Sequence, residues 1–325
     1  MRAITLAGFG AAEQLVPRTV ADPAPRPGWV TVELRASALN WHDVLVRRGR
    51  YGSPLPHVPG ADGAGVRTDT GAEVVILPSL FWGDRIEAPG PGFEILGDRI
   101  PGTYAQYVSV PEECLAPKPA RYSWEQAAAL SLVGVTTYRA LVTRAGLRAG
   151  ESLLVVGAGG GVATTAVALG NAVGATVFVT GSNPEKLERA RAAGAAGGVV
   201  HTGDDWPDRI ARRAPGGAGF DVVLDPVGVW DRSVRAVRPG GRLVVLGANV
   251  AERAHLDVRA FFFGQYSLLG TTMGGPADFR GLLELVASGA VAPPSIAEVF
   301  PLDEAAAAHR LLEAGTAFGK IVLRP

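Results

Sequence analysis

The pattern of apolar and polar positions changes character about a third of the way along the chain. Before residue 122, apolar and polar residues alternate in short stretches, most clearly at residues 29–40, and glycine and proline interrupt them. A period of two predicts strands that bury one face. Residues 79–101 are rich in aromatic residues, glycine and proline, which predicts a long surface or lid loop.

From Ser123 onward the pattern is that of alternating helices and strands. Ser123 and Gln126 have capping-box spacing, and Asn183 followed by Pro184 predicts the start of another helix. The predicted apolar strands lie at residues 152–157, 175–181, 198–201, 220–225, 242–247 and 267–273. Apolar strands joined by helical crossovers predict a parallel sheet that is covered on both faces.

Composition excludes several classes of protein. The 325 residues suit two domains, and a hydrophobic content of 47% excludes intrinsic disorder. The 31 basic and 31 acidic residues cancel, so we expect no nucleic-acid partner. The single cysteine, Cys114, excludes a disulfide framework and fits a reducing, cytoplasmic location. Residues 152–184 carry no charge, but their glycines favour a strand–turn–helix–strand unit over a membrane span.

The strongest chemical signal is a glycine cluster between a predicted strand and a predicted helix. Gly157, Gly160 and Ala163 fit a GxxGxxA spacing, whereas Val162 breaks a strict GxGxxG. Small residues here let the backbone approach a pyrophosphate, which the helix N-terminus then binds. A plain tight turn is the alternative, but the surrounding strand–helix alternation favours dinucleotide binding.

The residues after the next strand favour NADPH over NADH. NAD sites place an acid at the end of that strand, and residues 179–183 contain none. Ser182 offers a hydroxyl, and Lys186 offers a point charge for a 2′-phosphate. The alternative is that Lys186 is simply a solvated helix residue.

Several short motifs together resemble one family. They lie at residues 38–49, 59–65, 102–105, 127–130, 136–141, 220–225 and 319–323, in addition to the glycine turn. The chain is similar along its whole length to the medium-chain dehydrogenase/reductase superfamily, above all to its zinc-independent, quinone-oxidoreductase-like branch, whose members are often labelled zinc-type alcohol dehydrogenase-like. The resemblance implies an α/β fold in which a Rossmann domain (122–273) is inserted into a GroES-like, mostly-β catalytic domain (1–121 plus 274–325). It also implies an active site in the cleft between them.

The resemblance also bears on zinc. Zinc-dependent relatives carry Cys, His and Cys ligands where this chain has Asn40, Ala61 and Val133. Alanine and valine cannot ligate a metal, and a catalytic zinc needs three protein ligands. His42, Asp43, His57 and Asp62 could in principle regroup into another site. We nevertheless expect no metal.

Without a metal, the expected activity is hydride transfer from NADPH to a quinone or an α,β-unsaturated carbonyl. Charge then moves onto the carbonyl oxygen, where hydrogen-bond donors can hold it. Asn40 is the first catalytic candidate, with a turn-stabilising role as its alternative. Tyr51 and His42 are further candidates for oxyanion contact or proton delivery. The rival functions are a zinc-free carbonyl or alcohol oxidoreductase and a non-catalytic NADPH-binding structural or sensor protein.

The expected cofactor contacts extend beyond the residues already named, and the resemblance carries most of the additions. They are Thr136, Gly161, Val162, Asp225, Gly247 and Lys320. For Lys320 the alternative is an exposed lysine near the end of the chain.

A homodimer is the expected assembly. Residues 265–274 form the last predicted strand of the parallel series, and an exposed apolar sheet edge requires cover. A two-fold partner would supply it, as relatives often dimerise through this region. The alternative is that the helix predicted at residues 279–288 folds back over the edge.

Overall fold

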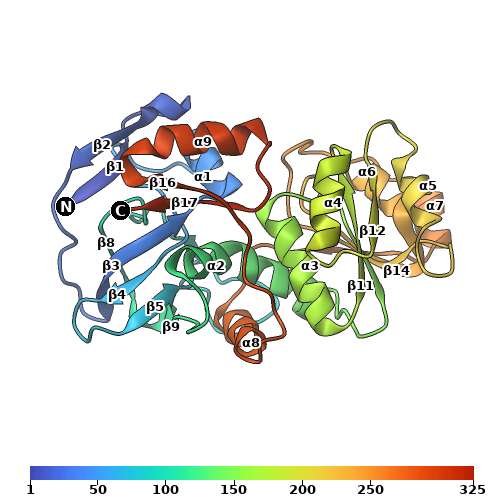
Figure 1. Cartoon of the computed structure of the whole chain (residues 1–325), viewed down its shortest axis with the longest axis horizontal. Helices are drawn as coiled ribbons and strands as arrows, with labels where there is room; N and C mark the ends of the chain where they lie inside the picture. Colours follow the sequence, from blue (N-terminus) through green and yellow to red (C-terminus); the bar gives the residue numbers. More distant parts are fainter. The chain divides into compact units, whose positions relative to one another are not determined.

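A computed structural model describes all 325 residues, which form two units (Figure 1). Unit 1 comprises Met1–Val135, Gly274–Leu283 and Pro293–Pro325, and unit 2 comprises Thr136–Met273 and Glu284–Ala292. Both ends of the chain therefore contribute to unit 1, and most of unit 2 is an insertion between them.

Unit 1 is organised around a seven-stranded sheet. Its strands follow the order β16-β17-β3-β4-β5-β9, and β8 pairs with β3. The strands are β3 (Trp29–Ala38), β4 (Ala64–Arg67), β5 (Glu73–Ile76), β8 (Tyr107–Pro111), β9 (Leu115–Pro117), β16 (Ile296–Pro301) and β17 (Lys320–Arg324). Neighbours are antiparallel except for β16 and β17. Buried and half-buried positions alternate along the first part of β3, as its sequence pattern predicts.

The two ends of the chain meet on β3. Val322 of β17 lies opposite Ala38, so Lys320 at the start of β17 is level with Asn40, which lies two residues beyond the end of β3. Gly319 makes this start possible, because its φ is +103° and an added Cβ would lie 2.4 Å from the carbonyl oxygen of Ser295.

Two helices of unit 1 lie close to the candidate catalytic residues. Helix α1 (Trp41–Arg47) follows Asn40, and α9 (Ala305–Ala314) packs beside it (Figure 1). Helix α9 also buries Ala305 and Ala308 against a core shared with β17 and with β1 (Arg2–Leu6), which pairs with β2 (Leu15–Thr19). The position of α1 is therefore set by packing from segments far apart in the sequence.

Unit 2 contains a six-stranded parallel sheet in the order β12-β11-β10-β13-β14-β15. Its strands are β10 (Ser152–Val155), β11 (Thr176–Gly181), β12 (Gly197–Val200), β13 (Phe220–Asp225), β14 (Val237–Val245) and β15 (Ser267–Gly270). Its helices are α3 (Gly161–Val173), α4 (Pro184–Ala192), α5 (Trp206–Ala211), α6 (Trp230–Ser233) and α7 (Val258–Phe263). The order in which the chain lays down these strands is that of the doubly wound Rossmann fold, which confirms the predicted fold class.

The local signals in the sequence act as expected. At the start of α2 (Trp124–Tyr138), the Ser123 N–H donates to Gln126 Oε1 at 3.0 Å and the Gln126 N–H donates to Ser123 Oγ at 3.3 Å. Asn183 caps α4 by accepting the Lys186 N–H at 2.9 Å. A helix of six residues in π geometry (Arg139–Arg144) follows α2, and α8 (Pro276–Ala287) precedes β16.

The predicted loop at residues 79–101 is almost entirely irregular, since only β6 (Ser79–Leu80) and β7 (Glu94–Ile95) pair within it. Residues 152–184 fold as β10, α3 and β11 and end at the first residue of α4. None of the helices combines the length and the apolar character that crossing a membrane requires.

Candidate active site

Asn40 lies at the turn between β3 and α1, where its backbone and its side chain serve different partners. Its backbone N–H donates to Asp43 Oδ2 at 2.7 Å, which satisfies a donor at the start of the helix. Its side chain points into the protein, and only 5% of the residue is exposed. The backbone of Asn40 therefore stabilises the turn, as the alternative interpretation expected. Its side-chain amide is not used in that hydrogen bond.

The amide of Asn40 is held between a buried lysine and a buried aspartate. Lys320 Nζ donates to Asn40 Oδ1 at 2.5 Å and to Asp62 Oδ2 at 3.0 Å, and Asn40 Nδ2 donates to the same Asp62 oxygen at 2.9 Å. The other Asp62 oxygen accepts the Leu132 N–H at 2.6 Å. Opposite charges on either side of the amide fix its orientation. Lys320 is 4% exposed, so the alternative of an exposed terminal lysine is wrong.

The residues at the zinc-ligand positions of zinc-dependent relatives cannot form a zinc site here. Ala61 and Val133 offer no donor atoms, and the Asn40 oxygen already faces the Lys320 ammonium. Regrouping fails too, because His57 Nε2 contacts the Gly97 carbonyl oxygen at 2.8 Å and Asp62 is paired with Lys320. No group of three or more His, Cys, Asp and Glu side chains could hold a metal ion. The donors present therefore do not fit a catalytic zinc.

His42 lies two residues beyond Asn40, between two carboxylates. Its Nε2 is 2.8 Å from Asp98 Oδ1, and its Nδ1 is 4.0 Å from Asp43 Oδ1. Burial by itself lowers the pKa of His42, but Asp98 and Asp43 outweigh it and raise the pKa above the usual value. Burial also raises the pKa of Asp43 to about 6, although His42 opposes this rise. The ring of Tyr51 packs against His42 with centroids 4.6 Å apart.

Asp43 also connects α1 to α9. Its Oδ2 accepts the Tyr104 hydroxyl at 3.3 Å, and that hydroxyl lies 3.0 Å from His309 Nε2. Burial lowers the pKa of His309 to about 3, so this ring is neutral at physiological pH. Neutral His309 adds no charge to the cluster around Asp43 and acts as a packing and hydrogen-bonding partner.

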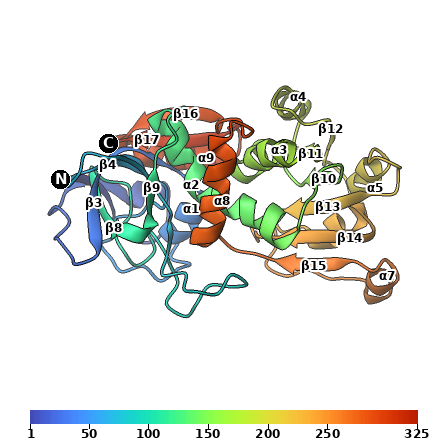
Figure 2. The ribbon, with the colours of Figure 1, turned by 90° about the horizontal axis from the view of Figure 1, so that it is seen from below.

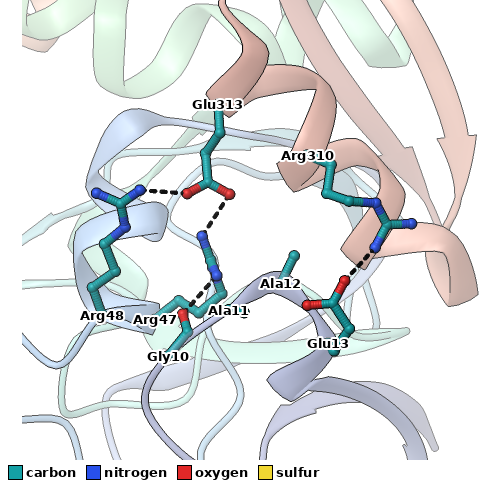
Figure 3. A pocket seen from close by; sticks show the side chains of 8 residues that line it. All are labelled: Gly10, Ala11, Ala12, Glu13, Arg47, Arg48, Arg310 and Glu313. Atoms are coloured by element: carbon teal, nitrogen blue, oxygen red, sulfur yellow. Dashed lines mark hydrogen bonds and ion pairs between the residues drawn. The ribbon is translucent and has the colours of Figure 1, made fainter.

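A pocket of ≈ 470 Å³ lies at the other end of α1 (Figure 3). Buried Arg47 donates to the Gly10 carbonyl oxygen at 2.6 Å and pairs with Glu313 of α9 at 2.7 Å, and Arg48 pairs with the second Glu313 oxygen at 2.6 Å. The remaining guanidinium, that of Arg310, pairs with Glu13 at 2.8 Å. Since every guanidinium already has a carboxylate, this pocket ties α1 to α9 and is a poor site for an anion.

The glycine turn of unit 2 folds tightly and leaves its backbone uncovered. Gly157 has a φ of +121°, and Gly160 precedes α3 with no atom within 4 Å of where a Cβ would lie. Gly161 and Val162 form the first turn of α3, whose N–H groups give a helix N-terminus its affinity for anions. The Gly157 N–H donates to Thr180 Oγ1 at 3.0 Å, which fixes the turn against β11.

Cations gather where β11 and β12 end. The hydroxyl of Thr180 lies 3.2 Å from His201 Nδ1, next to the end of β12. Burial lowers the pKa of His201, and nearby Arg232 and Lys186 lower it further. Ser182 is exposed just beyond β11, and no acid occupies that strand end. Arg232 and His201 were not among the residues that the sequence singled out.

The remaining expected cofactor residues shape the turns of unit 2. The Asp225 carboxylate is buried and accepts the N–H groups of Val227, Gly228 and Val229 and the Ser233 hydroxyl. A Cβ on Gly247 would lie 2.0 Å from the Pro226 carbonyl oxygen, so only glycine fits there. Thr136 Oγ1 contacts Met273 Sδ at 3.8 Å. Any contribution of Asp225 to cofactor binding would therefore act through the turn that it organises.

Comparisons with known proteins place these features in one family. Residues 26–120 match the alcohol dehydrogenase GroES-like domain, and residues 161–288 match the family described as zinc-binding dehydrogenase. The NADPH-dependent alkenal/one oxidoreductase of Arabidopsis thaliana is 31% identical over 100% of this chain and 80% of its own length. The chain belongs to the medium-chain dehydrogenase/reductase superfamily, in its quinone-oxidoreductase-like branch. It is an oxidoreductase of the kind that binds a nicotinamide dinucleotide.

Solved structures agree on the fold but differ in the activities that they carry. A structure described as an NAD-dependent alcohol dehydrogenase matches with a TM-score of 0.93 and 38% identity, covering 100% of both chains. A quinone oxidoreductase of Pseudomonas syringae matches with a TM-score of 0.82 and 28% identity over 100% of this chain and 99% of that chain. Family membership therefore does not determine the acceptor or the form of the nicotinamide cofactor.

Proposed function

We propose that this protein is a zinc-free, NADPH-dependent reductase of quinones or α,β-unsaturated carbonyl compounds. The observation that carries the proposal is the Lys320 ammonium buried between Asn40 and Asp62. The Lys320 ammonium thus contacts Asn40, the residue that matches a zinc-ligand position in zinc-dependent relatives. Oxidation of an alcohol would lose the metal that normally stabilises an alkoxide. An enolate spreads its charge over carbon and oxygen and needs less stabilisation.

The reaction needs a hydride, stabilisation of the charge that develops on the acceptor oxygen, and a proton. The reduced nicotinamide, when bound, supplies hydride to the β-carbon of the acceptor. In unit 1, the charge of the Lys320 ammonium is balanced by Asp62, but its third N–H can donate to the acceptor oxygen as negative charge develops there, and Asn40 holds Lys320 in position. The candidate proton donors in unit 1 are His42 and Tyr51, whose rings pack against each other. One hydride and one proton complete the reduction of the double bond.

A second candidate is a carbonyl or alcohol oxidoreductase. It is favoured by the 38% identical structure described as an NAD-dependent alcohol dehydrogenase. A protein that binds the cofactor without catalysis remains the rival from another class, because a fold does not determine an activity.

An acceptor panel separates these functions. NADPH consumption should be measured with 1,4-quinones, 2-alkenals, simple aldehydes and no acceptor, and alcohol oxidation should be followed with NADP⁺. We expect turnover of quinones and 2-alkenals only. Comparable kcat/KM values for simple aldehydes or alcohols would support the second candidate. Tight NADPH binding without any turnover would support the non-catalytic role.

The preference for NADPH rests on charge at the ends of β11 and β12. Lys186 and Arg232 are both close enough to His201 to lower its pKa, and Ser182, four residues before Lys186 in the chain, is exposed. A 2′-phosphate would meet two cations and a hydroxyl there. A ribose 2′-hydroxyl would lack the carboxylate that usually binds it.

Replacing Lys186 should reduce the affinity for NADPH selectively. We expect Lys186→Ala to weaken NADPH binding by about 1–3 kcal/mol, because a charge-assisted contact is lost, and to leave NADH binding almost unchanged. Fluorescence titration of both cofactors measures this. Arg191→Ala, on the same helix but paired with Glu188, is the control and should change neither affinity. Equal affinities of the wild-type protein for NADPH and NADH would contradict the assignment.

We also propose that two copies associate through the β15 edge of unit 2. β15 is the outermost strand of its sheet, and α7 lies beside it (Figure 2). Three side chains of α7 are strongly exposed: Val258 at 73%, Phe262 at 55% and Phe263 at 65%. Leu268 of β15 packs towards the core, so the apolar surface available to a partner is that of α7 and the strand edge.

Light scattering tests the assembly. We expect a particle of twice 33.7 kDa at micromolar concentration. Phe263→Asp should shift it towards monomer, because a charge would be buried at the interface. Ile86→Asp, at a position 63% exposed in unit 1, is the control and should leave the mass unchanged. A wild-type mass of 33.7 kDa would refute the dimer, and an unaltered Phe263→Asp dimer would place the interface elsewhere.

A further inference from the structure

His201 is held at the carboxyl edge of the parallel sheet, where the glycine turn also lies. It directly follows β12, and its backbone N–H donates to the carbonyl oxygen of Gly181, the last residue of β11, at 2.9 Å. Its ring atom Nδ1 lies 3.2 Å from Thr180 Oγ1, and that hydroxyl accepts the Gly157 N–H at 3.0 Å. A single buried threonine therefore connects the His201 ring to the turn that is expected to bind the pyrophosphate.

The hydrogen bonds of Thr180 assign the tautomer of the ring. Because Thr180 Oγ1 accepts from Gly157, its own hydrogen is available to donate to His201 Nδ1. The neutral ring therefore carries its proton on Nε2. No hydrogen bond within the protein engages Nε2, and the residue is partly exposed. The ring thus presents an N–H donor to a ligand at this edge of the sheet, while Nδ1 is the atom that can accept a second proton.

Cations from two other connections approach the same ring. Lys186 lies in the first turn of α4, after β11, and Arg232 lies in α6, after β13. Burial, Arg232 and Lys186 all lower the pKa of His201, so the ring is neutral at physiological pH in the free protein. Arg232 pairs only loosely with Asp204, at 3.8 Å, and the Asp204 side chain is 96% exposed to screening by solvent. The charge of Arg232 is therefore available to an anionic ligand.

Arg209 of α5 packs beside the same segment but is already engaged. Its guanidinium donates to the carbonyl oxygens of Val200 at 2.8 Å and Thr202 at 3.1 Å, on either side of His201 in the chain. It also pairs with Asp205 at 3.3 Å. Arg209 therefore fixes the backbone that carries the ring and adds no unbalanced charge beside it.

We propose that His201 binds the 2′-phosphate of NADPH and takes up a proton as it does so, which makes the preference for NADPH depend on pH. The inference rests on the proposed function, since NADH has no phosphate at this position. A proton from water adds to Nδ1, whose new N–H donates to Thr180 Oγ1, and the Nε2–H donates to a phosphate oxygen. A hydroxyl oxygen has two acceptor lone pairs, so Thr180 can accept from both Gly157 and the ring.

The sign of the pH dependence follows from the charge of the phosphate. Its second pKa is about 6, so the free cofactor carries a dianion at about pH 7.5. A dianion beside the ring favours the imidazolium, so the pKa of His201 should be higher in the complex than in the free protein, where it is lowered. Between these two values the affinity for NADPH should fall by up to about tenfold per pH unit as the pH rises. The affinity for NADH should not change with it.

Isothermal titration calorimetry in buffers of different ionisation enthalpy counts the protons that are taken up on binding. At about pH 7.5, above the second phosphate pKa, we expect uptake with NADPH and none with NADH. His201→Asn keeps an acceptor for the Thr180 hydroxyl but cannot titrate. It should bind NADPH severalfold more weakly, without proton uptake and with an affinity that does not vary over the same pH range. His255→Asn, at an exposed position of the same unit, is the control and should behave as the wild type does.

The outcomes separate this inference from the proposed function. Preferential binding of NADPH by the wild type without proton uptake would overturn the inference and leave the cofactor assignment intact. Uptake that persists in His201→Asn would also overturn it, because the proton would then reside on another group. Equal affinities for NADPH and NADH would count against the proposed cofactor, and the inference would fall with it. The wild-type comparison of the two cofactors does not depend on any variant folding.

Discussion

The buried contact between Lys320, Asp62 and Asn40 is the constraint on which the candidate active site depends. It joins residues that are 280 and 258 positions apart in the chain. A buried ion pair adds little stability by itself, but removing either partner leaves an uncompensated charge that costs several kcal/mol. The protein can retain it only if β17 pairs with β3 in the observed register. That register also ends β3 so that α1 begins at Trp41, and it thereby places His42 and Asp43.

Electrostatics then connects the parts of the site in unit 1. Lys320 neutralises Asp62, whereas Asp43 and Asp98 have no lysine or arginine of their own and act on His42. Strand pairing therefore holds the Lys320 ammonium in a fixed position. A reductase of activated double bonds needs a hydrogen-bond donor for the oxygen that gains charge, and a proton to finish the reaction. A dehydrogenase that works with zinc stabilises that oxygen with the metal.

The sequence indicates short-range features well and long-range side-chain partners poorly. The caps at Ser123 and Asn183, the positive φ at Gly157 and the parallel sheet all follow from spacing and periodicity within a few tens of residues. The contact of His42 with Asp98 depends on the path of an irregular loop, which no periodicity specifies. The family resemblance singled out Lys320 as a cofactor contact, but its pairing with Asp62 emerged only from the structure. Arg232 gave no signal, because its approach to His201 depends on how α6 packs against β13 and β14.

Metal content tests the central claim most directly, since the account assigns to Lys320 the place of a cation that zinc holds in other members of the superfamily. Elemental analysis of the purified protein, followed by assay of quinone and enone reduction before and after dialysis against a chelator, makes the measurement. The account predicts no stoichiometric zinc and an unchanged rate. One zinc per chain, lost together with activity and restored on adding the metal back, would contradict it.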